Sequence, residues 1–236
     1  MHATIFGPQR SGTNFLESLL KDNFEDVKIR NQDSNYVWKH CAYPEKFKGK
    51  LTDNDSINIV IHKNPYKWLE SLMRYNADLD NRYGGKREEY KDLYKVVQEG
   101  DITVQDKRGK NTNLGGACRL YNDFYHNWEN FKGVDVMWVR YEDLLVEESR
   151  ARILQQIQNK YKLRKKKGGW AVPKKVGQSD QWTDQRQQDY LNMSNFDKLE
   201  QRHIDLVNKY IDNKLLEKFN YPIISEKGWN INKRRN

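Results

Sequence analysis

The stretch Gly7-Pro8-Gln9-Arg10-Ser11-Gly12-Thr13 joins an apolar strand candidate, residues 3–6, to an amphipathic helix candidate that starts near Asn14. A glycine-containing turn between a strand and a helix N-terminus presents several backbone N–H groups to an anion. The sequence therefore predicts a phosphate-binding loop near the start of the chain. Gly-Pro and Ser-Gly pairs also occur in ordinary turns, so the loop by itself leaves both interpretations open.

The loop departs from the nucleoside triphosphate P-loop in its last two positions. Gly7 and Gly12 have the spacing of that motif, but Thr13 and Asn14 stand where it has Lys and then Ser or Thr. The lysine for the triphosphate and the hydroxyl for magnesium are both missing. Arg10 supplies a planar, permanently charged donor instead, which suits a tetrahedral oxyanion held without a metal. A P-loop nucleotide kinase stays the closest enzyme alternative.

Composition restricts the class of protein but not its partner. The 236 residues predict one domain, 1–236, and 14 Tyr and 7 Trp supply large buried surfaces despite an apolar fraction of only 36%. No apolar run is long enough to cross a bilayer, so we expect no membrane partner and a cytoplasmic protein. The net charge of +9 favours an anion, which is a nucleotide, a nucleic acid or an acidic acceptor.

Hydrophobic periodicity predicts alternating strands and helices, and hence an α/β fold with three layers, α/β/α, around a central parallel sheet. Cys41 and Cys118 match no zinc or redox spacing and are interpreted as reduced structural thiols. Two segments are polar or basic loops: 75–113, an insertion or lid that helps to shape an acceptor site, and 162–182. The predicted strands are 3–6, 27–30, 36–40, 57–62 and 134–140, and the predicted helices are 14–22, a helix from Pro65, 114–131, 150–161 and 196–219.

The loop resembles the 5′-phosphosulfate loop of the sulfotransferases that use 3′-phosphoadenosine-5′-phosphosulfate (PAPS). In that family a basic residue precedes Ser-Gly-Thr or Ser-Gly-Ser, and the arginine form seen here is most similar to the carbohydrate-modifying branch. The resemblance implies a P-loop-like sulfotransferase fold. It also implies that the loop binds PAPS and its product 3′-phosphoadenosine-5′-phosphate (PAP) through Gly7, Gln9, Arg10, Ser11, Gly12, Thr13, Asn14 and Phe15.

A second motif resembles the family's 3′-phosphate site. Lys63-Asn64-Pro65 is followed by Ser71, eight positions after Lys63, as in the family's pattern of a basic residue, Asn-Pro and a serine. Ser71 lies about two helical turns beyond Asn64. The resemblance therefore implies that Lys63 and Ser71 share one phosphate. Lysine stands here where the family commonly has arginine, which reduces bidentate contact.

A third motif, Trp38-Lys39-His40 at the end of a predicted strand, is similar to the Lys-x-His segment that carries the family's catalytic base. Here the lysine and the histidine are adjacent. Histidine suits the role of base because its ordinary pKa lies near neutrality. The resemblance implies that His40 removes the acceptor's proton, while Lys39 and Arg10 neutralise charge. A surface or core histidine is the alternative interpretation of His40.

Two basic segments resemble the family's Arg-Lys-Gly loop, which covers the 3′-phosphate. They are residues 164–168 and the later stretch that begins with Lys174 and Lys175. The sequence leaves both open, together with a solvated basic face. Tyr141-Glu142-Asp143-Leu144 also recurs in the family and is expected to be architectural.

The resemblance implies metal-independent, in-line transfer of a sulfuryl group from PAPS to a hydroxyl or amine of a small molecule or carbohydrate. The first two motifs stand in the family's order on the expected elements. A nucleic-acid-binding module is disfavoured, because the aromatic residues fall mainly at helical core spacing. A non-catalytic protein of the same fold stays open as an alternative.

Overall fold

The computed structural model describes residues 1–30, 37–52, 55–74, 102–105, 111–176, 180–181, 183–191 and 199–225. The chain groups into two compact units. The first comprises Met1–Gly7, Ser11–Lys63 and Phe131–Leu191, and the second Pro8–Arg10, Asn64–Asn130 and Asn192–Asn236. None of the helices within the described ranges is long and apolar enough to cross a bilayer.

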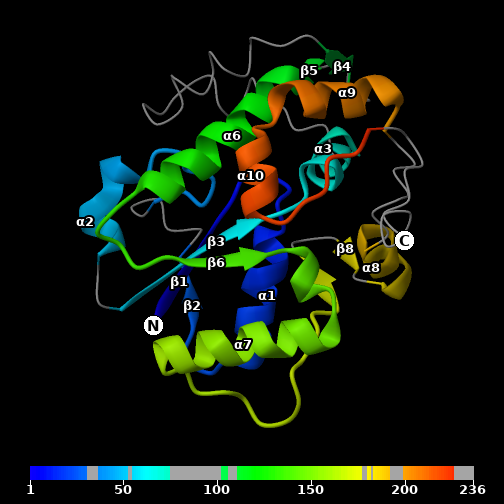
Figure 1. Ribbon diagram of the computed structural model, residues 1–236. Coiled ribbons are helices and arrows are strands. Elements are labelled where there is room, and N and C mark those ends of the chain that lie inside the picture. Colours follow the sequence, from blue (N-terminus) through cyan, green and yellow to red (C-terminus); the bar gives the residue numbers. More distant parts are fainter. Residues whose placement is uncertain are drawn as a thin grey trace. The chain divides into compact units, whose positions relative to one another are not determined.

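A parallel four-stranded sheet forms the centre of the first unit (Figure 1). Its order is β2-β1-β3-β6, and β1 pairs with β3 along its whole length, from His2 opposite Ser56 to Phe6 opposite Val60. The strand β3 carries the most β-branched run in the chain and is almost entirely buried, as expected for an inner strand of a parallel sheet. The strands are β1 His2–Phe6, β2 Lys28–Ile29, β3 Ser56–His62 and β6 Met137–Arg140.

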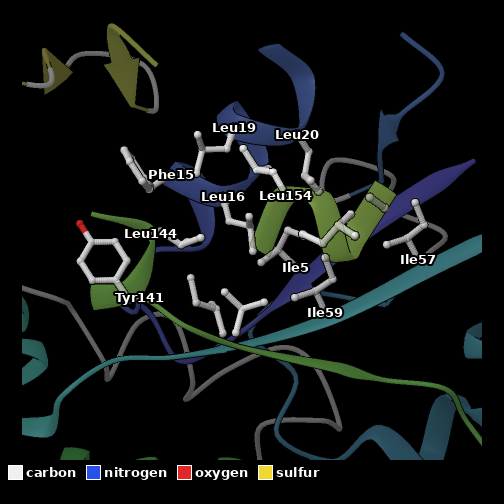
Figure 2. Close-up of a cluster of buried hydrophobic side chains, with 14 of the residues drawn as sticks. Ile5, Phe15, Leu16, Leu19, Leu20, Ile57, Ile59, Tyr141, Leu144 and Leu154 are labelled. Carbon is white, nitrogen blue, oxygen red and sulfur yellow. The ribbon is translucent and has the colours of Figure 1, made fainter. Parts of the chain in front are cut away.

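Helices α1 (Thr13–Asn23) and α7 (Glu147–Tyr161) cover one face of this sheet. Figure 2 shows Leu16, Leu19 and Leu20 of α1 packed over the strands together with Leu154 of α7. On the opposite face, the Asn58 side chain donates a hydrogen bond of 2.9 Å to the carbonyl of Leu51, at the end of the short helix α2 (Lys48–Leu51). The predicted α/β class with a central parallel sheet between helices is therefore confirmed.

The second unit is mainly helical. Its helices are α3 (Pro65–Arg74), α6 (Leu114–Asn130), α9 (Gln201–Tyr210) and α10 (Asn213–Lys218), beside a two-stranded hairpin of β4 (Thr103–Gln105) and β5 (Asn111–Asn113). Buried aromatic rings hold these helices together, since Tyr121 of α6 lies 5.1 Å from Trp68 of α3, and Tyr125 of α6 lies 5.3 Å from Phe219 at the end of α10, between ring centroids. Of the predicted insertion 75–113, residues 75–101 and 106–110 lie outside the described residues.

Two predicted elements were wrong, and one helix was missed. Residues 37–40 of the expected strand 36–40 form no strand, and Lys39 and His40 lie in a turn, while residues 31–36 lie outside the described part of the chain. The expected helix 196–219 is two helices, because the Asp212 side chain accepts from the Lys214 N–H at 2.9 Å and caps a new helix there. Helix α8 (Asp184–Leu191) lies beyond the predicted loop and was not expected. The strand expected at 134–140 is shorter, and the buried residues Cys41 and Cys118 form no disulfide among the described residues.

A buried histidine at the start of α9 makes stability depend on pH. The Glu200 N–H donates to His203 Nδ1 at 3.0 Å within a capping box, so the ring is neutral with its hydrogen on Nε2. Burial, and then the charge of Arg202, lowers the pKa of His203. The unfolded chain therefore binds a proton that the folded chain does not, and the free energy of unfolding falls as the pH drops below about 6.5.

We expect this fall in urea unfolding between pH 7 and pH 5, with a slope of at most about 1.4 kcal/mol per pH unit from this one group. His203→Asn is the control, because an amide oxygen can accept the same hydrogen bond but does not titrate. Equal pH dependence in the wild type and in this variant would show that His203 is not the responsible group.

Candidate functional site

The first and second motifs start at neighbouring strands of the first unit. Gly7 follows β1 and Lys63 follows β3 after His62, and these strands are parallel and adjacent. In the order β2-β1-β3, the chain passes from β1 to one neighbour and then crosses to the other. In open α/β sheets, ligands bind outside the carboxyl ends of the strands where the strand order reverses in this way.

Both glycines of the loop occupy positions that exclude a side chain. Gly12 has φ 101°, in the left-handed region, and a Cβ there would overlap the ring of Tyr141. A Cβ on Gly7 would overlap Ser11 Oγ and press against Ile61. Close contacts therefore require glycine at positions 7 and 12. This explains the two glycines better than the frequency of such dipeptides in ordinary turns does.

The loop presents hydrogen-bond donors at the N-terminus of α1. Within the described part of the chain, none of the N–H groups of residues 11–14 donates to a backbone carbonyl, and Ser11 Oγ, although fully buried, has no hydrogen-bond partner there. Buried polar groups are normally satisfied. Donors arranged in this way at a helix N-terminus suit an anion.

The third motif lies against the loop, although it is a turn and not a strand end. The Gly7 N–H donates to the Lys39 carbonyl at 3.0 Å, and the His40 ring contacts the Gly7 carbonyl at 2.6 Å through Nδ1. Both polar backbone groups of Gly7 are therefore bonded to residues 39 and 40. The structure brings together two motifs that are separated by more than twenty residues in the sequence.

The contact with Gly7 fixes the tautomer of His40. A carbonyl only accepts, so Nδ1 must carry the hydrogen, and the neutral ring has its basic lone pair on Nε2. The ring is also held edge-on against Trp38, with centroids 4.8 Å apart. Orientation of one ring nitrogen by a backbone carbonyl is the arrangement that a histidine base requires at the other nitrogen.

Lys39 connects the same turn to the first turns of α1. Its ammonium donates to Asn14 Oδ1 at 2.5 Å and to Glu17 Oε1 at 3.0 Å. Burial raises the pKa of Glu17, while the charge of Lys39 opposes this shift. Two of the three ammonium donors of Lys39 are used in these contacts. Lys39 thus holds Asn14 and Glu17 in place and keeps a third N–H.

Lys63 is also linked to the loop within the first unit. Its side chain is 2% exposed, and Nζ lies 5.0 Å from the ring centroid of Tyr141, the ring that packs on Gly12, and 4.1 Å from that of Tyr190. Tyr141 also meets Phe15 edge-on at 6.0 Å. The Tyr141 ring, expected to be architectural, therefore lies between the glycine loop and the cation of the second motif.

Gln9 and Arg10 of the first motif, and Asn64, Pro65 and Ser71 of the second, belong to the second unit. Arg10 has φ 69°, a left-handed conformation that is uncommon for a residue with a side chain, and the preceding carbonyl of Gln9 accepts from Trp68 Nε1 at 2.6 Å. Backbone conformations of this kind cluster at ligand sites. The hydrogen bond from the buried Trp68 of α3 fixes the loop backbone at Gln9.

The Asn-Pro pair starts helix α3. The Asn64 side chain accepts from the N–H groups of Tyr66 at 3.0 Å and Lys67 at 3.3 Å, which makes it the N-terminal cap, and Pro65 occupies the first helical position. Ser71 is 1% exposed and donates to the Lys67 carbonyl at 2.9 Å. This bond uses the single hydroxyl hydrogen, so a contact with a phosphate oxygen, which only accepts, would require the Ser71 hydroxyl to turn away from Lys67.

One of the two basic segments lies at the C-terminal end of α1. Residues 164–166 surround its C-terminal end: the Glu25 N–H donates to the Arg164 carbonyl at 3.0 Å, and Lys166 Nζ donates to the Lys21 carbonyl at 2.7 Å. That end is about 16 Å from the loop, at 1.5 Å per residue. Lys174 is exposed, and Lys175 begins β7 (Lys175–Val176), which contacts α1. Residues 164–166 therefore lie at the end of α1 that is far from the glycine loop.

Sequence reasoning missed two features of this region. It did not predict that the Tyr141 ring contacts Gly12 and Lys63, and it did not single out Tyr190 at all. Tyr141 was visible only as part of a recurrent tetrapeptide, and Tyr190 lies in α8, which no pattern predicted.

A cavity of about 370 Å³ lies at the opposite, amino-terminal edge of the sheet and is lined by Met1, Ser56, Val134 and Lys160, among others. None of the predicted site residues lines it.

Comparisons of the chain with protein-family models, curated proteins and solved structures found no match.

Proposed function

We propose that the chain is a sulfotransferase that binds PAPS at the carboxyl edge of β1 and β3. The observation that supports this proposal best is the convergence, within one unit, of three motifs that are distant in the sequence. The 39–40 turn bonds to both backbone groups of Gly7, and the ring of Tyr141 packs on Gly12 and beneath the ammonium of Lys63.

The residues present fit such a nucleotide. Glycines that exclude a Cβ leave backbone N–H groups at the start of α1, and the buried Ser11 hydroxyl has no partner among the described residues. Arginine and lysine are the cations of the donor set, which suits phosphate and sulfate oxygens. Arg10 and the N–H groups of residues 11–14 would hold the 5′ end, and Lys63 and Ser71 the 3′-phosphate.

PAPS supplies the sulfuryl group, and the chain supplies positioning and charge. Arg10 and the loop donors would stabilise the negative charge that develops on the oxygens of the leaving phosphate, and Lys39 would add its third N–H. The loss of one such donor commonly costs ~3 kcal/mol in the transition state. His40 Nε2 accepts the proton of the attacking hydroxyl. We propose a small molecule or carbohydrate as acceptor and the cytoplasm as the compartment.

Calorimetry with PAP tests the nucleotide site directly. We expect the wild-type chain to bind PAP, and Arg10→Ala and Lys63→Ala each to bind it tenfold or more weakly, since a charge-assisted hydrogen bond contributes about 1.5–3 kcal/mol. Lys166→Ala is the matched control, because this lysine caps the far end of α1, and it should bind like the wild type. The absence of PAP binding to the wild-type chain would end the proposal.

A chelator distinguishes this reaction from that of a nucleotide kinase. Thr13 and Asn14 replace the lysine and hydroxyl that handle magnesium and triphosphate in a P-loop. We expect sulfuryl transfer to be unchanged, within about twofold, when excess EDTA is added. A strict magnesium requirement together with ATP turnover would select the kinase instead.

A further inference from the structure

Two tyrosines enclose the ammonium of Lys63 in the first unit. Nζ lies 4.1 Å from the ring centroid of Tyr190 and 5.0 Å from that of Tyr141, and the two rings meet edge-to-face with centroids 5.5 Å apart. All three side chains are buried: Lys63 is 2% exposed, Tyr141 4% and Tyr190 7%. The charge is therefore placed against two aromatic rings rather than in bulk water.

Burial of an ammonium group on a flexible four-carbon side chain costs free energy in two ways. Removal from water disfavours the charge, and fixing the side chain costs rotamer entropy. The negative face of an aromatic ring attracts a cation, and it does so more strongly where water is excluded. Two such rings compensate for part of the burial and restrict where Nζ can lie.

Both rings are themselves fixed. The Tyr141 N–H donates to the His62 carbonyl at 2.8 Å, which continues the pairing of β3 with β6, and its ring is backed by Gly12. Tyr190 is carried by α8, where the Gln187 side chain donates to the Leu145 carbonyl at 2.5 Å. The Lys63 ammonium thus lies between two fixed rings, Tyr141 after β6 and Tyr190 in α8.

We propose that Tyr190 is a positioning residue for the phosphate-binding lysine: with Tyr141 it forms an aromatic cage that holds the Lys63 ammonium at the carboxyl edge of β3 before the nucleotide arrives. This inference rests on the proposed function. The cage lowers the cost of binding because Lys63 is already ordered. It requires the ring face of Tyr190 and not its hydroxyl.

The test compares two substitutions of Tyr190 by calorimetry with PAP. Tyr190→Phe keeps the ring face and should bind PAP within about twofold of the wild type, whereas Tyr190→Leu should bind about tenfold more weakly. In a Lys63→Met background, Tyr190→Leu should cause no further loss, because the cation that it positions is gone. Circular dichroism and thermal unfolding of each variant establish that it is folded.

The outcomes separate this inference from the proposed function. PAP binding by the wild type with an undiminished affinity in Tyr190→Leu overturns the cage and leaves the sulfotransferase proposal standing. An equal loss from Tyr190→Leu in the wild-type and Lys63→Met backgrounds also overturns it, because a purely structural role would act in both. A wild-type chain that binds no PAP overturns the proposed function first, and the cage's role in binding with it.

Discussion

His40→Asn should abolish most of the sulfuryl transfer while it leaves nucleotide binding almost unchanged. The asparagine amide can donate to the Gly7 carbonyl as Nδ1 does, at 2.6 Å in the wild type, so the 39–40 turn keeps its bond to the loop. The base at Nε2 is lost. General base catalysis typically contributes a factor of 10²–10⁴, and we expect kcat to fall by about that factor.

The measurement is the initial rate with ³⁵S-labelled PAPS and the monosaccharide that the wild-type chain sulfates fastest in a panel. PAP affinity is measured in parallel by calorimetry. His126→Asn is the matched control, because His126 pairs with Asp212 at 2.9 Å in the second unit and belongs to none of the three motifs. A kcat for His40→Asn within about threefold of the wild type would remove His40 from the mechanism.

Gly12→Ala should weaken both PAP binding and folding, because it combines two separate costs. An alanine with φ near 101° is strained by about 1 kcal/mol, and its Cβ would overlap the ring of Tyr141. Overpacking of this kind typically costs 1–3 kcal/mol. The ring must move, and with it the contacts of Tyr141 to Phe15 and Lys63. We expect a loss of about 2–4 kcal/mol in the free energy of unfolding.

Gly168→Ala provides a control with the same backbone strain. Gly168 has φ 102°, and a Cβ built there meets nothing within 4 Å. It should therefore lose only about 1 kcal/mol in urea unfolding and bind PAP like the wild type. Equal losses of stability and affinity in the two variants would show that Tyr141 does not press on the loop.

The sequence was sufficient for the parts of the fold that local pattern specifies. The run of β-branched residues in β3 and the helical stripes of α1 and α3 lie where periodicity predicted them, and Pro65 lies at the start of α3. It failed where one local interaction overrides periodicity. Asp212 ends one helix and caps another inside a continuous apolar pattern, and no pattern marked α8.

In the candidate site, too, some features could be predicted from local sequence and others could not. Local chemistry was enough to identify the glycine loop, because Gly7, Gly12 and the neighbouring donor residues are adjacent in the chain. The 37–40 segment was identified by its residue types but was given the wrong backbone, since its hydrogen bonds go to Gly7 and not along a strand ladder. Only tertiary contacts showed that residues 164–166 of one basic segment lie at the far end of α1.

By itself the sequence determined that this chain forms strands and helices in α/β order and that a loop suited to an anion follows the first strand, because spacing, charge and turn chemistry act between near neighbours. The tertiary structure alone decided that the His40 ring bonds to Gly7, and that Tyr141 and Tyr190 enclose Lys63. Such contacts join residues far apart in the chain. Their positions follow from strand pairing and core packing, which no short stretch of sequence specifies.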